Sequence, residues 1–131
     1  MADMMQFELV SPERKLASVQ ARAVQIPAAD GDLTAMPDHA PLITTLRPGV
    51  LVVDGADGET RFAVTGGFTE ITPNTTSVLA ERAYPVGQEG RDALQALLDE
   101  TRAKAATAEG HDRDALNKAA DDLANTIATM F

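Results

Sequence analysis

The amino-acid composition of this 131-residue chain changes abruptly near residues 85–90, in the stretch YPVGQEG. Residues 1–84 contain twenty Val, Ile or Thr residues and six of the seven Pro residues, whereas residues 91–131 contain five Val, Ile or Thr residues, no Pro and eleven Ala residues. β-branched side chains favour the pleated surface of a sheet, and Ala has the highest helix propensity. The composition therefore predicts a β domain over residues 1–86 that is followed by a helical region over residues 87–131.

Turn-forming residues divide the first region into short segments with the spacing of about 8–12 residues that is typical of a β-sandwich or barrel. Val19 to Ile26 is expected to form a strand, and PAADGD after it a turn. Gly55 to Gly58 is expected to form a four-residue hairpin loop. The pattern predicts about eight to ten short strands that enclose one core between two sheets.

The second region carries two stripes of apolar and small residues at helical spacing. They are Leu94, Leu97, Leu98, Thr101 and Ala105, and then Leu116, Ala119, Ala120, Leu123, Ile127 and Phe131. Gly110 is expected to stop the first helix, and Asp112 or Asp114 to cap the second. The pattern predicts an antiparallel helical hairpin whose Ala-rich interface buries little area per contact and is therefore weakly held.

The charge of the chain and its lack of cysteine exclude several classes of protein. Eleven Lys and Arg against twenty Asp and Glu give a net charge of −9, which repels the phosphate backbone of nucleic acids. No apolar run approaches the roughly 18 residues that a membrane helix needs, and the first ten residues do not resemble a signal peptide. Without Cys there is no disulfide framework, thiolate nucleophile or cysteine metal site. The sequence predicts a cytoplasmic bacterial protein that does not bind nucleic acid.

His39 is the residue best suited to catalysis or metal binding, because Asp30, Asp32 and Asp38 lie near it in the sequence. The segment DGDLTAMPDH does not have the spacing of an EF-hand loop, and the Ser and Gly residues form neither a nucleophile elbow nor a phosphate-binding loop. We therefore expect no catalytic residue and no metal site. Asp30 and Asp32 are expected to form a turn, and His39 to order a proline-bracketed loop or contact a partner.

Three segments of the chain together resemble the epsilon subunit of bacterial F-type ATP synthase: MQFELVSPE, IPAADGDLTAMPDHAPLITTLRPGVL and FAVTGGFTEITPNTTSVLAERA. The similarity runs without gaps over most of residues 5–83, and the core PDHAPL is specific to that family. Ala28 and Asp32 stand where the family usually has Gly and Glu, and Thr34-Ala35 replaces a usual Gly followed by Ile or Val. In the nomenclature of eukaryotic organelles the equivalent chain is called delta.

The resemblance implies an α+β fold that is mainly β in its N-terminal part: a ten-stranded antiparallel β-sandwich followed by the two-helix hairpin. It also implies a non-catalytic part of the central stalk. The sandwich would bind the gamma subunit, and its lower edge would sit on the ring of membrane-embedded c subunits during proton-driven ATP synthesis. The protein would be peripheral, held at the cytoplasmic face of the bacterial inner membrane only through the complex. The c-ring contact is expected in the loop that carries Asp32, Met36, Pro37, His39 and Pro41.

The resemblance also implies that the helical hairpin has a regulatory role. Family members can extend the hairpin along gamma towards the alpha and beta subunits and inhibit ATP hydrolysis, using basic residues on the second helix. In this chain the second helix carries only Arg113 and Lys118, beside four Asp residues, so we expect no strong inhibition. The Asp residues are Asp112, Asp114, Asp121 and Asp122.

The segment LDETRA at residues 98–103 resembles a motif by which some family members bind ATP on the hairpin. In that interpretation Arg102 donates hydrogen bonds to phosphate and Asp99 orients the base or the arginine. In the alternative interpretation the two residues form only an ion pair across one helical turn. Residues 91–131 hold five basic and eight acidic groups, which repels a polyphosphate, so we expect at most weak ATP binding and no other cofactor.

Two other classes of function are alternatives to the rotor. A sandwich with a helical hairpin could be a generic adaptor or chaperone subunit of another complex, which would pair stably with something other than gamma. It could also be a small hydrolase, whose turnover would depend on His39.

Overall fold

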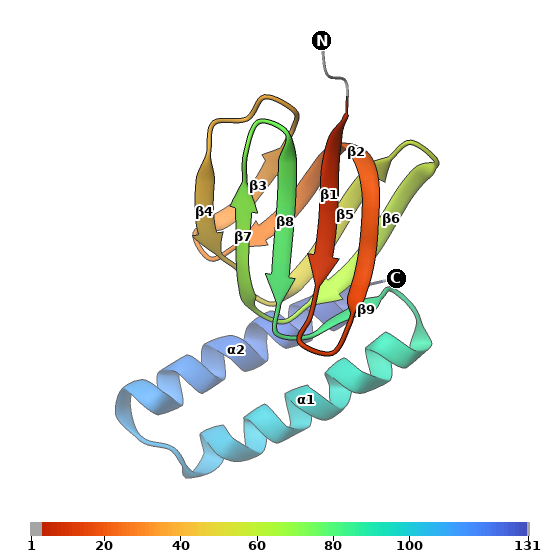
Figure 1. Ribbon diagram of the computed structural model, residues 1–131. Helices are drawn as coiled ribbons and strands as arrows, with labels where there is room; N and C mark the ends of the chain where they lie inside the picture. Colours follow the sequence, from red (N-terminus) through yellow and green to blue (C-terminus); the bar gives the residue numbers. More distant parts are fainter. Residues whose placement is uncertain (1–3, 131) are drawn as a thin grey trace.

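The computed structural model describes residues 4–130, which form nine strands and two helices (Figure 1). The strands are β1 (Met5–Val10), β2 (Lys15–Ala28), β3 (Gly31–Ala35), β4 (Leu42–Thr45), β5 (Gly49–Gly55), β6 (Gly58–Val64), β7 (Gly67–Ile71), β8 (Thr75–Ala80) and β9 (Ala83–Pro85). The helices are α1 (Gln88–Thr107) and α2 (Gly110–Thr129). All strands precede both helices, so the order predicted from the composition is confirmed.

Strand β2 joins the two layers of the sandwich. The hydrogen-bonded strand order is β4-β7-β8-β1-β2-β5-β6-β9, and β3 pairs with β2 beside this path. The first part of β2 pairs with β1, and its later part pairs with β3 and β5. The pairing with β5 begins at Ala21 and contains a register shift between Ala21 and Ala23. One layer therefore contains β4, β7, β8, β1 and the start of β2, and the facing layer contains the rest of β2 with β3, β5, β6 and β9 (Figure 1).

The described residues form nine strands where ten were expected, and the length of β2 explains the difference. Because this strand of 14 residues contributes to both layers, counting it once in each gives five strand segments per layer. The predicted strand from Val19 to Ile26 covers only the middle of β2. The polar start of β2 carries no strong strand signal, but it is held by its pairing with β1. The sandwich class is confirmed.

Two details of strand pairing differ from the sequence-based prediction. β1 and β8 pair in parallel rather than antiparallel, since they are distant in the sequence and no tight turn connects them. The β5–β6 connection has two residues rather than four, because Gly55 and Gly58 pair with each other. Gly58 has a φ of 122°, a conformation that L side chains rarely adopt, so glycine suits this turn.

The main hydrophobic core lies between the two layers. Along β1 the buried side chains of Met5, Phe7 and Leu9 alternate with partly exposed ones. Ile26 and Leu51 reach the same core from the facing layer. Burial of one such side chain contributes about 1.5–3 kcal/mol relative to its exposed state, so this core is the main source of the stability of the sandwich.

The two helices pack against each other and against β5 and β9 at one end of the sandwich (Figure 1). Leu94 and Leu98 of α1 and Leu123 and Ile127 of α2 are buried in a second cluster with Ala63 of β6. This cluster is separate from the main core. The predicted hairpin is therefore confirmed, with its own small core. Within residues 4–130, no helix is both long and apolar enough to span a membrane.

The turn between the helices consists of Ala108 and Glu109, and α2 begins at Gly110. The predicted capping positions were wrong, because Asp112 and Asp114 both lie inside α2. Gly110 has a φ of 62°, so it does not merely stop the first helix but supplies the left-handed backbone with which the second begins. Asp112 lies in the first turn of α2, where a carboxylate interacts favourably with the helix dipole.

Candidate functional site

The loop between β3 and β4, residues 36–41, is held in shape by backbone hydrogen bonds. The N–H of Asp38 donates to the carbonyl oxygen of Pro73 at 2.8 Å, which ties the loop to the turn between β7 and β8. The N–H of His39 donates to the carbonyl oxygen of Met36 at 3.2 Å, which closes a turn inside the loop. Asp38 has a φ of 68°, a left-handed conformation that Asp adopts more readily than most residues. The loop is therefore an ordered surface.

Four of the five residues predicted to contact the c-ring lie in this loop. Met36 is 54% exposed and Pro41 is also exposed, whereas Pro37 and His39 are half-buried. The Nδ1 atom of His39 lies 2.6 Å from the carbonyl oxygen of Ala40, so the backbone of the loop holds the imidazole ring. The loop presents an apolar surface of Met and Pro side chains around a fixed histidine.

Asp32, the fifth residue, does not share this loop with His39. It is the second residue of β3, and Met36 follows four residues later, about 13 Å further along an extended chain. The guanidinium of Arg47 binds the Asp32 carboxylate and also donates to the carbonyl oxygen of Ala28. The expectation of a single loop was wrong, because β3 separates the two residues.

The carboxylates near His39 in the sequence do not assemble around it. Within residues 4–130, no three His, Cys, Asp or Glu side chains lie close enough together to hold a metal ion. Asp32 pairs with Arg47, and the ring of His39 contacts Ala40. The two residues therefore take part in separate interactions at opposite ends of β3.

Large apolar side chains are exposed on the outer face of the layer that contains β4, β7 and β8. Ile43 is 67% exposed, Phe68 43% and Leu79 41%. Phe68 lies directly opposite Leu79 of β8, and Ile43 of β4 is a diagonal neighbour of Phe68, opposite Glu70. Side chains in such positions are within reach of one another. We call these three residues, Ile43, Phe68 and Leu79, the outer patch.

The hairpin residues of the ATP-binding hypothesis lie on the exposed face of α1. The Oδ1 atom of Asp99 accepts a hydrogen bond of 3.1 Å from Nε2 of Gln95, one turn earlier. Within residues 4–130 there is no ion pair between Asp99 and Arg102, so the alternative interpretation of the motif was wrong in this detail. On α2, Lys118 pairs with Asp122 at 3.0 Å, which occupies one of the two basic side chains of that helix.

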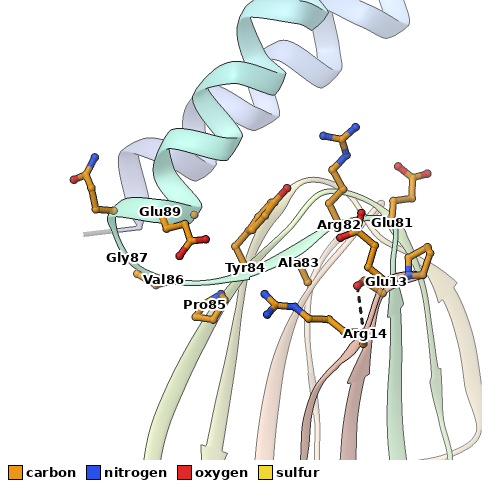
Figure 2. A pocket seen from close by; sticks show the side chains of 14 residues that line it. Glu13, Arg14, Glu81, Arg82, Ala83, Tyr84, Pro85, Val86, Gly87 and Glu89 are labelled. Carbon is orange, nitrogen blue, oxygen red and sulfur yellow. Dashed lines mark hydrogen bonds between the residues drawn. The ribbon is translucent and has the colours of Figure 1, made fainter.

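An open cavity of about 980 Å³ lies between the β1–β2 turn, the β8–β9 turn and the start of α1. Figure 2 shows Arg14 and Arg82 on its wall together with Glu13, Glu81 and Glu89. Acidic and basic side chains are mixed along the wall, so the lining does not select for a ligand of either charge.

A family model described as the ATP synthase, delta/epsilon chain, beta-sandwich domain matches residues 4–86, which is more than half of the chain. The chain belongs to the ATP synthase delta/epsilon family. The family resemblance inferred from the sequence segments is confirmed, and with it the expectation of a non-catalytic ATP synthase subunit. The matched region contains the outer patch, the β3–β4 loop and the Asp32–Arg47 pair.

Curated relatives of this delta/epsilon chain match it over nearly its whole length. The ATP synthase epsilon chain of Ruegeria sp. (strain TM1040) is 54% identical over 130 residues, which is 99% of this chain and 93% of the relative. The ATP synthase epsilon chain of Jannaschia sp. (strain CCS1) is 51% identical over 123 residues, which is 94% of this chain and 93% of the relative. These relatives therefore include both the sandwich and the hairpin.

Two solved assemblies contain chains with the same fold as this delta/epsilon chain. A chain of the Euglena gracilis mitochondrial ATP synthase structure with OSCP, F1 and c-ring aligns with a TM-score of 0.78 and 19% identity, over 100% of this chain and 84% of that one. A chain of the Tetrahymena thermophila mitochondrial ATP synthase central stalk and c-ring aligns with a TM-score of 0.58 and 18% identity, over 96% and 92%. The fold is thus shared with distant mitochondrial chains.

Two features of this delta/epsilon chain were not found by sequence reasoning. The role of Arg47 depends on β4–β5 lying beside the β2–β3 turn, which no local pattern reveals. The outer patch was detectable in part, since Phe68 alternates with the buried residues Thr69 and Ile71 along β7. Alternation separates the two faces of a strand, but it does not say which face another layer covers when both carry apolar residues.

Proposed function

We propose that this delta/epsilon chain is a rotor part of the ATP synthase central stalk, which joins a gamma-type subunit to the ring of c subunits and performs no chemistry itself. The observation that carries this proposal is the outer patch. Its three large apolar side chains lie close together and exposed on the outer face of one layer, and the inner face of that layer is packed against the main core. A cluster of this kind on a folded domain is typical of a surface that a partner covers.

The outer patch is the surface we propose for gamma. Phe68 is its central aromatic residue, and aromatic side chains at the centre of an interface commonly dominate the binding energy. Complete burial of such a side chain contributes about 1.5–3 kcal/mol, and binding would supply the share that belongs to the area still exposed. Glu70 borders the patch on the same face of β7 and supplies a polar rim.

The β3–β4 loop is the surface we propose for the c-ring, through Met36, Pro37, His39 and Pro41, with Asp32 contributing from β3. Its backbone hydrogen bonds to Pro73 and within the loop support this role, because an ordered loop loses little entropy on binding. The exposed Met36 and Pro41 offer apolar contacts to the ring. The Asp32 carboxylate is already paired with Arg47, so it acts there as half of an ion pair rather than as a free charge.

This assembly determines where the protein works. The chain is peripheral at the cytoplasmic face of the bacterial inner membrane and is held there by its partner subunits. Its net charge of −9 favours protein partners over nucleic acid. It needs no cofactor, and ATP binds at most weakly at Asp99 and Arg102. Extension of the hairpin would bring it to the alpha and beta subunits, but the pairing of Lys118 with Asp122 leaves little positive charge on α2 for strong inhibition.

A binding experiment with a tagged gamma subunit tests the proposed patch. In Phe68→Glu, the charge placed at the centre of the outer patch should reduce capture by gamma at least about tenfold, since a charge buried without a partner costs several kcal/mol. The melting temperature should change little, because the side chain at this position faces solvent in the isolated chain.

Val19→Glu is the control for the added charge, because Val19 is also 43% exposed but lies on β2 opposite Phe7, outside the outer patch; its melting temperature is measured as well. It should bind gamma like the unmodified chain. Equal capture of Phe68→Glu and the unmodified chain would contradict the proposed patch, and stable pairing with a partner unlike gamma would favour a generic adaptor.

A further inference from the structure

In the structure the hairpin is docked, which means that it packs against the sandwich, and within residues 88–130 this position buries most of its large apolar side chains. Leu94, Leu98, Leu123 and Ile127 are buried between the helices and the sandwich. The large apolar side chains that remain exposed within residues 4–130 all belong to the β part of the chain; they are Val19, Met36, Leu42, Ile43, Phe68 and Leu79. Leu97 and Leu116 stay partly exposed in the docked hairpin, whereas the four buried side chains become available to other proteins only when the hairpin leaves the sandwich.

Gly90 lies at the point where the hairpin meets the sandwich most closely. It is buried in the first turn of α1. A Cβ atom at this position would lie 2.9 Å from the carbonyl oxygen of Pro85, 2.9 Å from Cβ of Tyr84 and 3.5 Å from Cε of Met130. The first two distances are shorter than real Cβ atoms accept, and both involve atoms on or next to the β9 backbone.

The segment that Gly90 approaches cannot easily move away. Strand β9 pairs with β6 through Ala83, Tyr84 and Pro85. The N–H of Val86 also donates to the carbonyl oxygen of Arg61 at 3.1 Å, which fixes the chain directly before α1. Figure 2 shows this segment passing under the first turn of the helix, with Tyr84, Pro85 and Val86 labelled. A side chain at position 90 would therefore have to displace the helix rather than the strand.

The contact at Gly90 involves both ends of the hairpin. Gly90 is the third residue of α1, and Met130, whose Cε atom is the third neighbour, directly follows the last residue of α2. Displacement of the first turn of α1 therefore also disturbs the end of α2. The second core has seven buried residues against sixteen in the main core, so less buried area resists this displacement.

We propose that Gly90 is the residue that permits the docked position of the hairpin, and that a single methyl group there shifts the protein towards an undocked hairpin with an exposed apolar stripe. Two effects act in the same direction. A Cβ atom collides with β9 in the docked state, and Ala stabilises the same helical turn more than Gly does once it is free. Glycine at this position thus favours docking at the expense of helix stability.

The chain contains no Cys, so a pair of introduced cysteines can carry spin labels without further changes. Thr60→Cys on β6 and Ala103→Cys on α1 are suitable because both positions are exposed. In the otherwise unmodified chain, the distance between the labels should have one narrow distribution. Gly90→Ala should add a second, broader distribution and raise the ratio of undocked to docked molecules on the order of tenfold, with the helical circular dichroism preserved.

Gly87→Ala is the matched control. It makes the same chemical change three residues earlier, where a Cβ atom would meet nothing within 4 Å, so its distance distribution should match that of the unmodified chain. The proposal fails if Gly90→Ala keeps the unmodified distribution, or if Gly87→Ala changes it equally. It also fails if Gly90→Ala loses the amide spectrum of the strands, because Gly90 would then support the whole fold rather than docking. The measurement needs no partner subunit, so its result is independent of the proposed rotor function.

Discussion

Arg47 joins segments that lie far apart in the sequence. Its side chain reaches the carbonyl oxygen of Ala28 and the carboxylate of Asp32, and its N–H donates to the carbonyl oxygen of Pro27 at 2.9 Å. The β2–β3 turn is thus fastened to the chain that leads from β4 into β5. The guanidinium is partly buried, which makes these charge-assisted hydrogen bonds stronger than those of an exposed arginine.

At the residue scale, we predict that Asp32→Ala and His39→Ala weaken coupling without unfolding the sandwich. The Asp32 side chain is 76% exposed, so solvent screens its charge and the pair contributes only about 0–1 kcal/mol. The partly buried Arg47 keeps its hydrogen bond to the carbonyl oxygen of Ala28 when Asp32 is replaced. Melting temperatures of the two variants should therefore stay close to that of the unmodified chain. ATP-driven proton pumping by the assembled enzyme in membrane vesicles should fall, because both residues belong to the proposed c-ring surface.

Asp57→Ala, at the tip of the exposed β5–β6 turn, is the control for these two variants and should leave both melting and pumping unchanged. A large loss of stability in Asp32→Ala or His39→Ala would show that the residue is structural. Unchanged pumping would remove that residue from the proposed interface.

The sequence predicted which residues form the loop better than it predicted which residues contact one another. The choice of Met36, Pro37 and Pro41 rested on a family resemblance, and these residues do form one ordered loop. The pairing of Asp32 with Arg47 could not be predicted, because 15 residues separate the two side chains and only the folded strands bring them together.

At the element scale, helices and strands were predictable where periodicity was strong. The stripe of Leu94 and Leu98 faces the second core as expected, because buried apolar residues at helical spacing define one face. The start of α2 was not predictable, since Asp112 and Asp114 are equally good caps by composition, and the φ of Gly110 depends on how the two helices meet.

For the exposed face of α1, we predict that ATP causes only small amide shifts at millimolar concentration, centred on residues 99–102, and that Arg102→Ala abolishes them. Five basic groups against eight acidic ones over residues 91–131 oppose tight binding of a polyphosphate. Arg113→Ala, on α2, should keep the shifts. The absence of shifts in the unmodified chain, or equal shifts in Arg102→Ala, would rule out a nucleotide site on this helix.

At the scale of the whole molecule, the β-then-α composition predicted the class of fold, whereas the strand order was not predictable. The pairing of β1 with β8 joins residues about 70 positions apart, as in Gln6 opposite Thr75. Local patterns carry no information about which distant strands become neighbours. The contribution of β2 to both layers could not be predicted for the same reason.

We also predict that the chain truncated after Val86 still unfolds cooperatively and binds gamma. Its main core contains no residue of either helix, and the outer patch lies in the β part. The free energy of unfolding should fall somewhat, because Val50, Ala63 and Tyr84 become more exposed when the helices are removed. Urea unfolding and gamma capture would measure the two properties. A truncated chain that is molten, or that gamma does not capture, would show that the hairpin belongs to the folding unit. Isolated residues 88–131 should be only partly helical, because short helices gain most of their stability from packing.

The course of β2 through both layers has a mechanical consequence. In the proposed rotor, gamma holds the face formed by β4, β7 and β8, and the c-ring pushes through the loop after β3, so the applied twist would tend to slide one sheet over the other. A single peptide chain of 14 residues runs from one sheet into the other, hydrogen-bonded to β1 in the first and to β3 and β5 in the second. Sliding would have to break these ladders together, so the sandwich should transmit torque as a stiff block and leave elastic deformation to longer, thinner parts of the machine.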